Sequence, residues 1–251
     1  MKARLKAASG FAPGRSHLQR DVRCEDFALA YRSRSQDFGC AVLADGAGSK
    51  RNSQVGAEAA CTVTASILKS LKETILADPI KAGALVLSGV RSQIDHLASV
   101  SGEPFDQFGS TLLFSSIYFE RGSWYTFSGQ LGDGVVVLDN SSEQKVQFRQ
   151  VKGIYVNETV FTTSDSPEKH LQIDLRCETR PIGFLLASDG VAQNLVDMKS
   201  EAPSNACAAI FSWVKNHRQD VIQRAVQSNL EGIFRENSFD DISMALVATV
   251  R

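Results

Sequence analysis

Apolar residues along the chain follow two patterns, short runs typical of strands and four-residue spacings typical of helices. The longest runs, such as Phe38–Ala44 and Phe184–Ser188, are continuously small or apolar, which predicts strands buried on both faces. The segments with strand character are, in chain order, 3–9, 26–31, 37–44, 111–119, 123–127, 135–138, 145–150, 184–188 and 242–250.

The helical spacing lies between and after these runs. Between Ser53 and Ala77 one predicted face carries Val55, Ala59, Val63, Ile67, Leu71 and Ile75. Asp78-Pro79 ends this helix, and 79–99 reads as a second, with Leu85, Ile94 and Leu97 among its apolar positions. A helix-rich stretch spans about 203–234, whereas the long polar segment 151–180 is irregular and predicts a flap. Strands in runs and helices in pairs indicate an α+β fold.

Composition narrows the class of protein. The chain has 251 residues, of which 43% are hydrophobic, and it shows no linker or repeat, so a single domain over 1–251 is expected. The net charge is −1, and Lys and Arg are scattered apart from a loose N-terminal cluster, which is not the electrostatic pattern expected for binding nucleic acid or an anionic membrane. No apolar stretch approaches the ~20 residues of a membrane helix, and no signal peptide is evident. Five cysteines without Cys-x-x-Cys spacing favour reduced thiols in a cytoplasmic protein.

Three Asp-Gly pairs are the first candidates for chemistry: Asp45-Gly46, Asp133-Gly134 and Asp189-Gly190. Asp-Gly is also a common hairpin turn, and Asp133 fits that alternative well because strand-like residues flank it. Asp45 and Asp189 instead follow buried strands and precede a loop and helix. Each therefore delivers a carboxylate to the edge of the core, where it needs a cation or a donor.

Other acidic residues lie at predicted strand ends as well. Glu25-Asp26 opens one strand and Asp240 precedes the last, although each alone would be a solvated surface group by default. Together, four strand ends that present Asp or Glu predict oxygen ligands for hard divalent cations such as Mg²⁺ or Mn²⁺. Two such ions can activate water for in-line attack on phosphorus. Neither a P-loop nor a Gly-x-Gly-x-x-Gly motif is present.

In this order, the motifs resemble those of the metal-dependent serine/threonine protein phosphatases of type 2C, the PPM family. The resemblance covers nearly the whole chain, and Gly14-x-Ser-His17 is similar to a compact bacterial branch. The motifs are Cys24-Glu-Asp26, Ala44-Asp-Gly-Ala-Gly48, Gly109-Ser-Thr111, Gly132-Asp-Gly134, Ala187-Ser-Asp-Gly190 and Phe239-Asp-Asp-Ile-Ser243.

The resemblance implies two antiparallel β-sheets packed as a sandwich with helix pairs outside, and a site with two Mn or Mg ions. It implies that Asp45 bridges both ions, that a Gly46 carbonyl joins one, and that Asp189 and Asp240 complete the first ion's ligands. Glu25 would reach the second ion, with Asp26 close by. Asp133 falls where many members bind a third ion, and 151–180 falls where they carry a variable flap.

The activity implied is hydrolysis of phosphoserine and phosphothreonine monoesters by metal-activated water, with a phosphoprotein substrate and a cognate serine/threonine kinase as partners. Two positions depart from the family. The phosphate-binding Arg is replaced by Asp21, so that Arg20 is the first candidate for that role, with Arg15 and Arg23 as alternatives. A general-acid His is replaced by Ala47, and His17 is the candidate proton donor.

Two other functions stay open. A catalytically silent phosphatase-like domain would bind a phosphoprotein or regulate a kinase, and the missing arginine motivates that alternative. A hydrolase of small phosphate esters would use the same carboxylates. The oligomeric state does not follow from the sequence.

Overall fold

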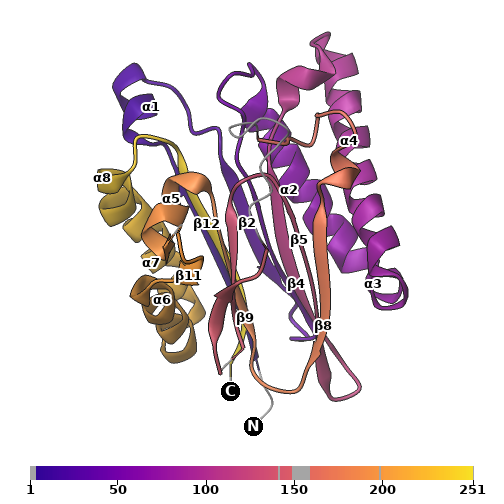
Figure 1. The fold of residues 1–251 in the computed structure, drawn as a ribbon, viewed down its shortest axis with the longest axis vertical. Helices are drawn as coiled ribbons and strands as arrows, with labels where there is room; N and C mark the ends of the chain where they lie inside the picture. The colour runs from indigo at the N-terminus through magenta and orange to yellow at the C-terminus, as the bar shows by residue number, and fades with distance from the viewer. Residues whose placement is uncertain (1–3, 141, 149–158, 198, 251) are drawn as a thin grey trace.

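The computed structural model describes residues 4–140, 142–148, 159–197 and 199–250. Two antiparallel sheets pack face to face, and helices cover the outer face of each sheet (Figure 1). This arrangement confirms the α+β class predicted from the order of strands and helices, and the sandwich with outer helices that the resemblance implied.

Each large sheet has five strands in the described residues. The first has the order β1 (Arg4–Ala12), β12 (Ile242–Val250), β9 (Gly183–Ala187), β6 (Val135–Asp139) and β7 (Gln144–Val146). The second has the order β2 (Phe27–Arg32), β3 (Phe38–Ala44), β4 (Leu112–Glu120), β5 (Ser123–Leu131) and β8 (Gln172–Glu178). A separate two-stranded pairing joins β10 (Val196–Asp197) to β11 (Ala202–Pro203).

Strand β3 shows why the predicted strands are apolar throughout. Its residues alternate between two cores: Ala41 and Leu43 belong to the cluster between the sheets, whereas Cys40 and Val42 belong to the cluster beneath the helices. All seven residues of β3 are buried. A strand covered on both faces has no position for a polar side chain, so the run ends only where Asp45 leaves the sheet.

Helices α2 (Ser53–Ser70), α3 (Lys72–Ala77) and α4 (Pro79–Ser101) cover the outer face of the second sheet. The prediction of one helix over 53–77 was wrong, because Leu71 has φ −101° and ψ 21° and divides it into α2 and α3. The N-cap of α4 is Asp78, whose side chain accepts a hydrogen bond from the Lys81 backbone N–H at 3.0 Å.

The face that α2 turns to the sheet differs from the predicted one. Small residues such as Ala57, Ala60 and Cys61 are fully buried there, whereas Val55, on the predicted face, is 43% exposed. Ile67, also on the predicted face, packs against α4 instead, since a Cβ at Gly89 would lie 2.4 Å from its Cδ1. The helix therefore presents small residues to the sheet and its larger apolar residues to its neighbour.

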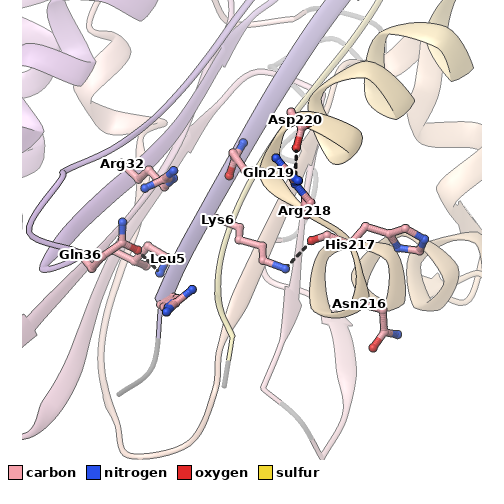
Figure 2. Close-up of a pocket in the computed structure, with 10 residues that line it drawn as sticks. Leu5, Lys6, Arg32, Gln36, Asn216, His217, Arg218, Gln219 and Asp220 are labelled. Carbon is pink, nitrogen blue, oxygen red and sulfur yellow. Dashed lines mark hydrogen bonds and ion pairs between the residues drawn. The ribbon is translucent and has the colours of Figure 1, made fainter. Parts of the chain in front are cut away.

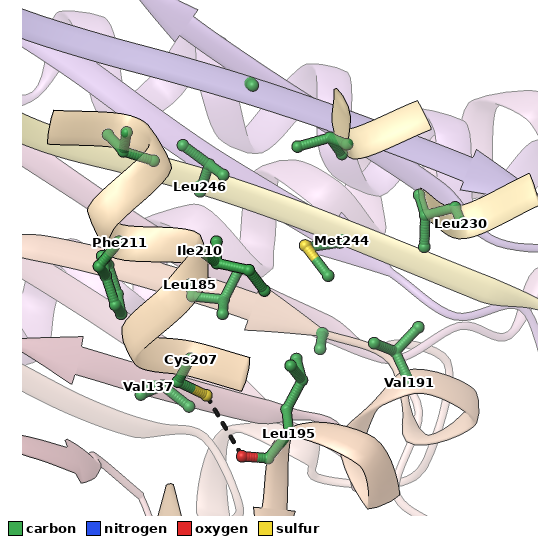
Figure 3. Close-up of a cluster of buried hydrophobic side chains, with 14 of the residues drawn as sticks. Val137, Leu185, Val191, Leu195, Cys207, Ile210, Phe211, Leu230, Met244 and Leu246 are labelled. Carbon is green, nitrogen blue, oxygen red and sulfur yellow. Dashed lines mark hydrogen bonds between the residues drawn. The ribbon is translucent and has the colours of Figure 1, made fainter. Parts of the chain in front are cut away.

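The outer face of the first sheet is covered by α5 (Asp189–Leu195), α6 (Asn205–Asn216) and α7 (Gln219–Asn229). A π-helical turn, Leu230–Phe234, and the short α8 (Arg235–Asn237) follow α7. Figure 3 shows Ile210 and Phe211 of α6 facing Leu185 of β9, in a cluster that also contains Met244 and Leu246 of β12. This packing fixes α5, and with it Asp189, against the sheet.

Three glutamines of α7 close the outer edge of β1. Gln219 hydrogen-bonds with the N–H and the carbonyl of Ala7, and Gln223 with the N–H and the carbonyl of Ser9. Gln227 donates to the carbonyl of Phe11 at 3.2 Å. We call these three side chains the glutamine ladder. It satisfies the backbone groups that an edge strand otherwise leaves open.

The segment 151–180 is only partly as expected. Residues 149–158 lie outside the described chain, but Gln172–Glu178 is strand β8, which pairs with β5, so the prediction of an irregular segment was wrong there. The rest of the described part is a loop with one 3₁₀ turn, Pro167–Lys169. Across the described residues, no helix combines the length and the apolar character that crossing a bilayer requires.

Candidate active site

A cavity of about 180 Å³ lies at one end of the sandwich. The sheet register explains its position. In the second sheet, Phe27 at the start of β2 pairs with Ala44 at the end of β3. In the first sheet, Ala187 at the end of β9 pairs with Val135 at the start of β6. Side chains just before or after these residues therefore meet at one end. The lining residues are His17, Glu25, Asp45, Gly46, Ala47, Gly48, Thr111, Asp133, Thr159, Phe161, Asp189, Asp240 and Asp241.

Asp45 is held in position by its own backbone. Its N–H donates to Thr111 Oγ1 at 2.9 Å, and its carbonyl accepts from the Thr111 N–H at 2.8 Å. Gly46 next to it approaches another backbone closely, since a Cβ at this position would lie 2.5 Å from the Glu25 carbonyl oxygen. Glycine thus lets the Asp45 and Glu25 segments come together.

The carboxylates of the cavity repel one another. Burial raises the pKa of Asp45 well above its usual range, and the negative charges of Asp26 and Asp189 raise it further. Burial, followed by the charges of Asp133 and Asp240, raises the pKa of Asp189. The described lining contains six carboxylates but no lysine or arginine. The site therefore has a strong excess of negative charge.

Asp26 lies behind the cavity, not in its lining. It is 1% exposed, and its Oδ2 accepts a hydrogen bond from Ser243 Oγ at 2.7 Å, while its Oδ1 is buried without a hydrogen-bond partner. Burial raises the pKa of Asp26 to about 7. A buried carboxylate oxygen without a donor is costly, which points to a missing cation or water in this region.

The residues present fit a pair of hard divalent cations in chemistry. All the ionisable oxygen donors are carboxylates, the preferred ligands of Mg²⁺ and Mn²⁺, and the orphaned Asp26 Oδ1 adds another. The carboxylates lie farther apart than they would around a bound ion. As they stand, no three His, Cys, Asp or Glu side chains of the described chain converge closely enough to ligate one ion.

Asp241 joins three segments at the cavity. Its carboxylate accepts from the Gly14 N–H at 2.8 Å, from the Glu25 N–H at 2.6 Å and from His17 Nδ1 at 2.9 Å. Gly14 fits closely here, because a Cβ on it would lie 2.0 Å from the Asp240 carbonyl oxygen. The Asp241 carboxylate thereby fixes His17, with its Nδ1 as the bonded nitrogen, in the cavity wall.

The arginine candidates lie elsewhere. Residues Arg15–Arg20 form a short helix, α1. Arg20 is exposed outside the cavity lining, and its Nε donates to the Ser16 carbonyl at 3.1 Å; Arg23 is exposed as well. The Arg15 guanidinium stacks over the Phe239 ring, 4.0 Å from its centroid. None of the three lines the cavity.

The loop that contains Thr159 and Phe161 closes the cavity near Asp133. Thr159 Oγ1 donates to Asp133 Oδ2 at 2.6 Å, and Phe161 also lines the wall. Arg91 of α4 holds this loop, since its Nη1 donates to the carbonyls of Thr162 at 2.6 Å and Ser164 at 3.1 Å. Arg91 therefore positions a wall of the cavity without touching the cavity itself.

The structure brings most of the predicted site residues together and adds others. Glu25, Asp45, Gly46, Asp133, Asp189, Asp240 and His17 share one cavity. Asp241 was missed although it belongs to the quoted Asp-Asp pair, and that second carboxylate was the available signal. Thr111 belongs to the quoted Gly109-Ser-Thr111 motif but was given no role in the site, and Thr159 was missed because it has no sequence signature of its own.

Fold and site together define a class of protein, an α-β-β-α sandwich with a carboxylate-lined cavity where the strands of both sheets end. The family model described as Protein phosphatase 2C matches residues 13–235. The chain belongs to this family.

Solved structures agree on the fold. The catalytic domain of the serine threonine protein phosphatase PstP, in complex with two manganese ions, is 15% identical with a TM-score of 0.59, and each chain is covered by 100%. PppA, a regulatory component of the type VI secretion system of Pseudomonas aeruginosa, is 17% identical with a TM-score of 0.61 over 97% of each chain. The S. agalactiae serine/threonine phosphatase is 13% identical with a TM-score of 0.62, over 97% of this chain and 98% of that one. A search of curated proteins gave no match.

Proposed function

We propose that the chain is a metal-dependent protein serine/threonine phosphatase that hydrolyses phosphoserine and phosphothreonine monoesters on proteins. The observation that carries this proposal is the cavity itself, in which six carboxylates gather without a lysine or arginine in the described lining, in a chain of the protein phosphatase 2C family. Such a cavity attracts divalent cations and repels a bare phosphate ester.

The proposed ligand roles follow the family pattern. Asp45 would be shared by two ions, Asp189 and Asp240 would hold the first with a Gly46 carbonyl, and Glu25 would reach the second. Asp26, whose buried Oδ1 has no hydrogen-bond partner, would lie close by. Asp133 is proposed to hold a third ion. Bound Mn²⁺ or Mg²⁺ would supply Lewis-acid chemistry, lowering the pKa of a coordinated water and neutralising phosphoryl oxygens.

His17 is proposed as the proton donor to the leaving alkoxide. Its Nδ1 is bonded to the Asp241 carboxylate at 2.9 Å, which leaves Nε2 as the nitrogen available to a substrate. The phosphate-binding guanidinium stays a prediction for Arg20, with Arg15 and Arg23 as alternatives. Substituting each by Gln and comparing KM for a phosphopeptide would identify it.

The decisive experiment measures turnover of a phosphothreonine peptide and of p-nitrophenyl phosphate, with and without Mn²⁺, together with metal analysis. Asp189→Ala should remove nearly all Mn²⁺-dependent turnover and leave the circular dichroism spectrum unchanged. Asp95→Ala is the matched control, because Asp95 is an exposed carboxylate on α4 outside the cavity. Unchanged turnover in Asp189→Ala would contradict the site assignment.

The same experiment decides between the alternatives. A silent phosphatase-like domain is favoured by the absence of arginine from the described lining, and it would bind a phosphopeptide without turnover. A small-ester hydrolase would turn over p-nitrophenyl phosphate far better than the peptide. A cognate kinase as partner and a cytoplasmic location are proposed with the phosphatase function; five free cysteines, four of them buried, support the latter.

A further inference from the structure

A second cavity, of about 640 Å³, lies at the opposite end of β1 from the carboxylate cavity (Figure 2). β1 begins at Arg4, beside this second cavity, and ends at Ala12, two residues before Gly14, which bonds Asp241. The eight steps of strand from Arg4 to Ala12, at about 3.3 Å each, separate the two sites by roughly 26 Å. The lining residues are Arg4, Leu5, Lys6, Arg32, Gln36, Asn216, His217, Arg218, Gln219 and Asp220.

The charge of this cavity is opposite to that of the catalytic one. Arg4, Lys6, Arg32 and Arg218 contribute four positive charges against the one carboxylate of Asp220. That carboxylate is already neutralised, since Arg218 Nε lies 3.2 Å from its Oδ1 and Arg224 Nη2 lies 3.2 Å from its Oδ2. The cavity therefore has a net positive charge in a chain whose total charge is −1.

Most polar groups of the lining are already bonded within the protein. Lys6 Nζ donates to the carbonyls of Val214 at 2.7 Å and His217 at 2.6 Å, at the carboxyl end of α6. Gln36 Oε1 accepts from the Leu5 N–H at 2.7 Å. Gln219 belongs to the glutamine ladder. These groups form the floor and are not free for a ligand.

Two guanidiniums are the exception. Among the described residues, Arg4 and Arg32 have neither an ion pair nor a side-chain hydrogen bond. They come from β1 and β2, which are edge strands of different sheets, so the cavity lies where the two sheet edges meet. An arginine fork binds two oxygens of a phosphate at once, and two forks at one cavity suit a ligand with adjacent phosphate groups.

We propose that this cavity binds a small molecule with at least two linked phosphate groups, a nucleoside polyphosphate or inorganic diphosphate. Its volume is in the range of small-molecule sites, larger than a single phosphate ion needs. Arg4 and Arg32 bind the phosphates, while Lys6 and Arg218 contribute positive potential. The site is separate from the catalytic cavity and does not depend on hydrolysis.

The test measures binding of diphosphate, ATP and adenosine to metal-free protein by calorimetry in EDTA. Without metal, the carboxylate cavity repels phosphate, so phosphate binding reports on the second cavity, whether or not the chain is a phosphatase. Both ATP and diphosphate should bind, and their ratio identifies the source of the phosphates. Adenosine binding as tightly as ATP, or no phosphate binding at about 1 mM, would overturn the proposal.

Variants assign the binding to the two arginines. Arg4→Gln and Arg32→Gln should each weaken diphosphate binding about ten-fold, and the double variant about a hundred-fold. The matched control is Arg51→Gln with Arg121→Gln, which removes two exposed charges outside the cavity and should leave binding within about two-fold. A urea unfolding curve checks that the variants are folded. Equal losses in both double variants would mean general electrostatics and would refute the site.

Discussion

Replacing Asp45 by Asn should stabilise the metal-free protein at pH 8. Asp45 is a buried carboxyl group whose pKa is raised first by burial and then by the charges of Asp26 and Asp189. Asparagine has nearly the same shape and keeps hydrogen-bonding groups, but it carries no charge. The substitution therefore removes one desolvated, repelled carboxylate from the cluster.

The magnitude follows from the neighbouring Asp26, whose pKa rises from 3.8 to about 7. Each unit corresponds to about 1.4 kcal/mol, so a buried carboxylate of this kind costs on the order of 4 kcal/mol once ionised. Removing the Asp45 charge relieves Asp26, so Asp45→Asn should raise the free energy of unfolding at pH 8 in EDTA by up to this order of magnitude.

The direction of the pKa shift determines how the stability of the metal-free protein depends on pH. The folded pKa of Asp26 is raised to about 7, so the folded metal-free protein binds more protons at this group than the unfolded chain between pH about 4 and about 7. The metal-free protein is therefore more stable at low pH, and this additional free energy of unfolding is lost as the pH rises through about 7. The advantage of Asp45→Asn should be small at pH 5 and full at pH 8.

Urea unfolding followed by circular dichroism, in EDTA at pH 5 and pH 8, measures this difference. Asp95→Asn on the exposed face of α4 should change the midpoint little at either pH. Added Mn²⁺ should raise the midpoint of the wild type and not that of Asp45→Asn. A variant less stable than the wild type at pH 8 in EDTA would refute the electrostatic reasoning.

Two further substitutions test the walls of the cavity. Gly46→Ala should lower phosphatase turnover more than ten-fold and cost about 1–3 kcal/mol of stability, because its Cβ would meet the Glu25 carbonyl at 2.5 Å; Gly232→Ala, with open space around it, should change neither. Arg91→Ala should release the loop that bonds Asp133 and thereby raise KM for a phosphopeptide several-fold, with a nearly constant free energy of unfolding. Arg91→Lys should bring KM only slightly back toward the wild-type value. Wild-type kinetics in either alanine variant would contradict the corresponding contact.

The carboxylate cavity was predictable because its residues follow or precede buried strands. Asp45 and Asp189 could be assigned to strand ends from apolar runs alone, and the face-to-face packing of the two sheets places those ends at one end of the sandwich. Asp26 was predicted near the metals, but its position behind the cavity depends on the Ser243 hydroxyl, a tertiary contact that no local pattern encodes.

Of the remaining features, one was indicated by the sequence but misinterpreted, and two were not indicated by it. In β8, Gln172–Glu178 alternates strictly between polar and apolar residues, so the period-two signal was present within the segment interpreted as irregular. The sheet-facing side of α2 could not be predicted from hydrophobicity, because the close approach of the sheet selects alanine and cysteine over valine. Arg20 could be placed in the chain but not in the cavity, since its orientation depends on α1.

The glutamine ladder joins a helix to a strand although the two advance by different distances between bonded residues. Its residues are four apart on α7, an advance of about 6.0 Å, and bond every second residue of β1, an advance of about 6.6–6.8 Å. The helix advances roughly 0.7 Å less than the strand at each glutamine, so its side chains stay in register with the strand for only a few positions. Three amide side chains bond five outward backbone groups of this short edge, so a foreign chain finds little open backbone there on which to start a fibril.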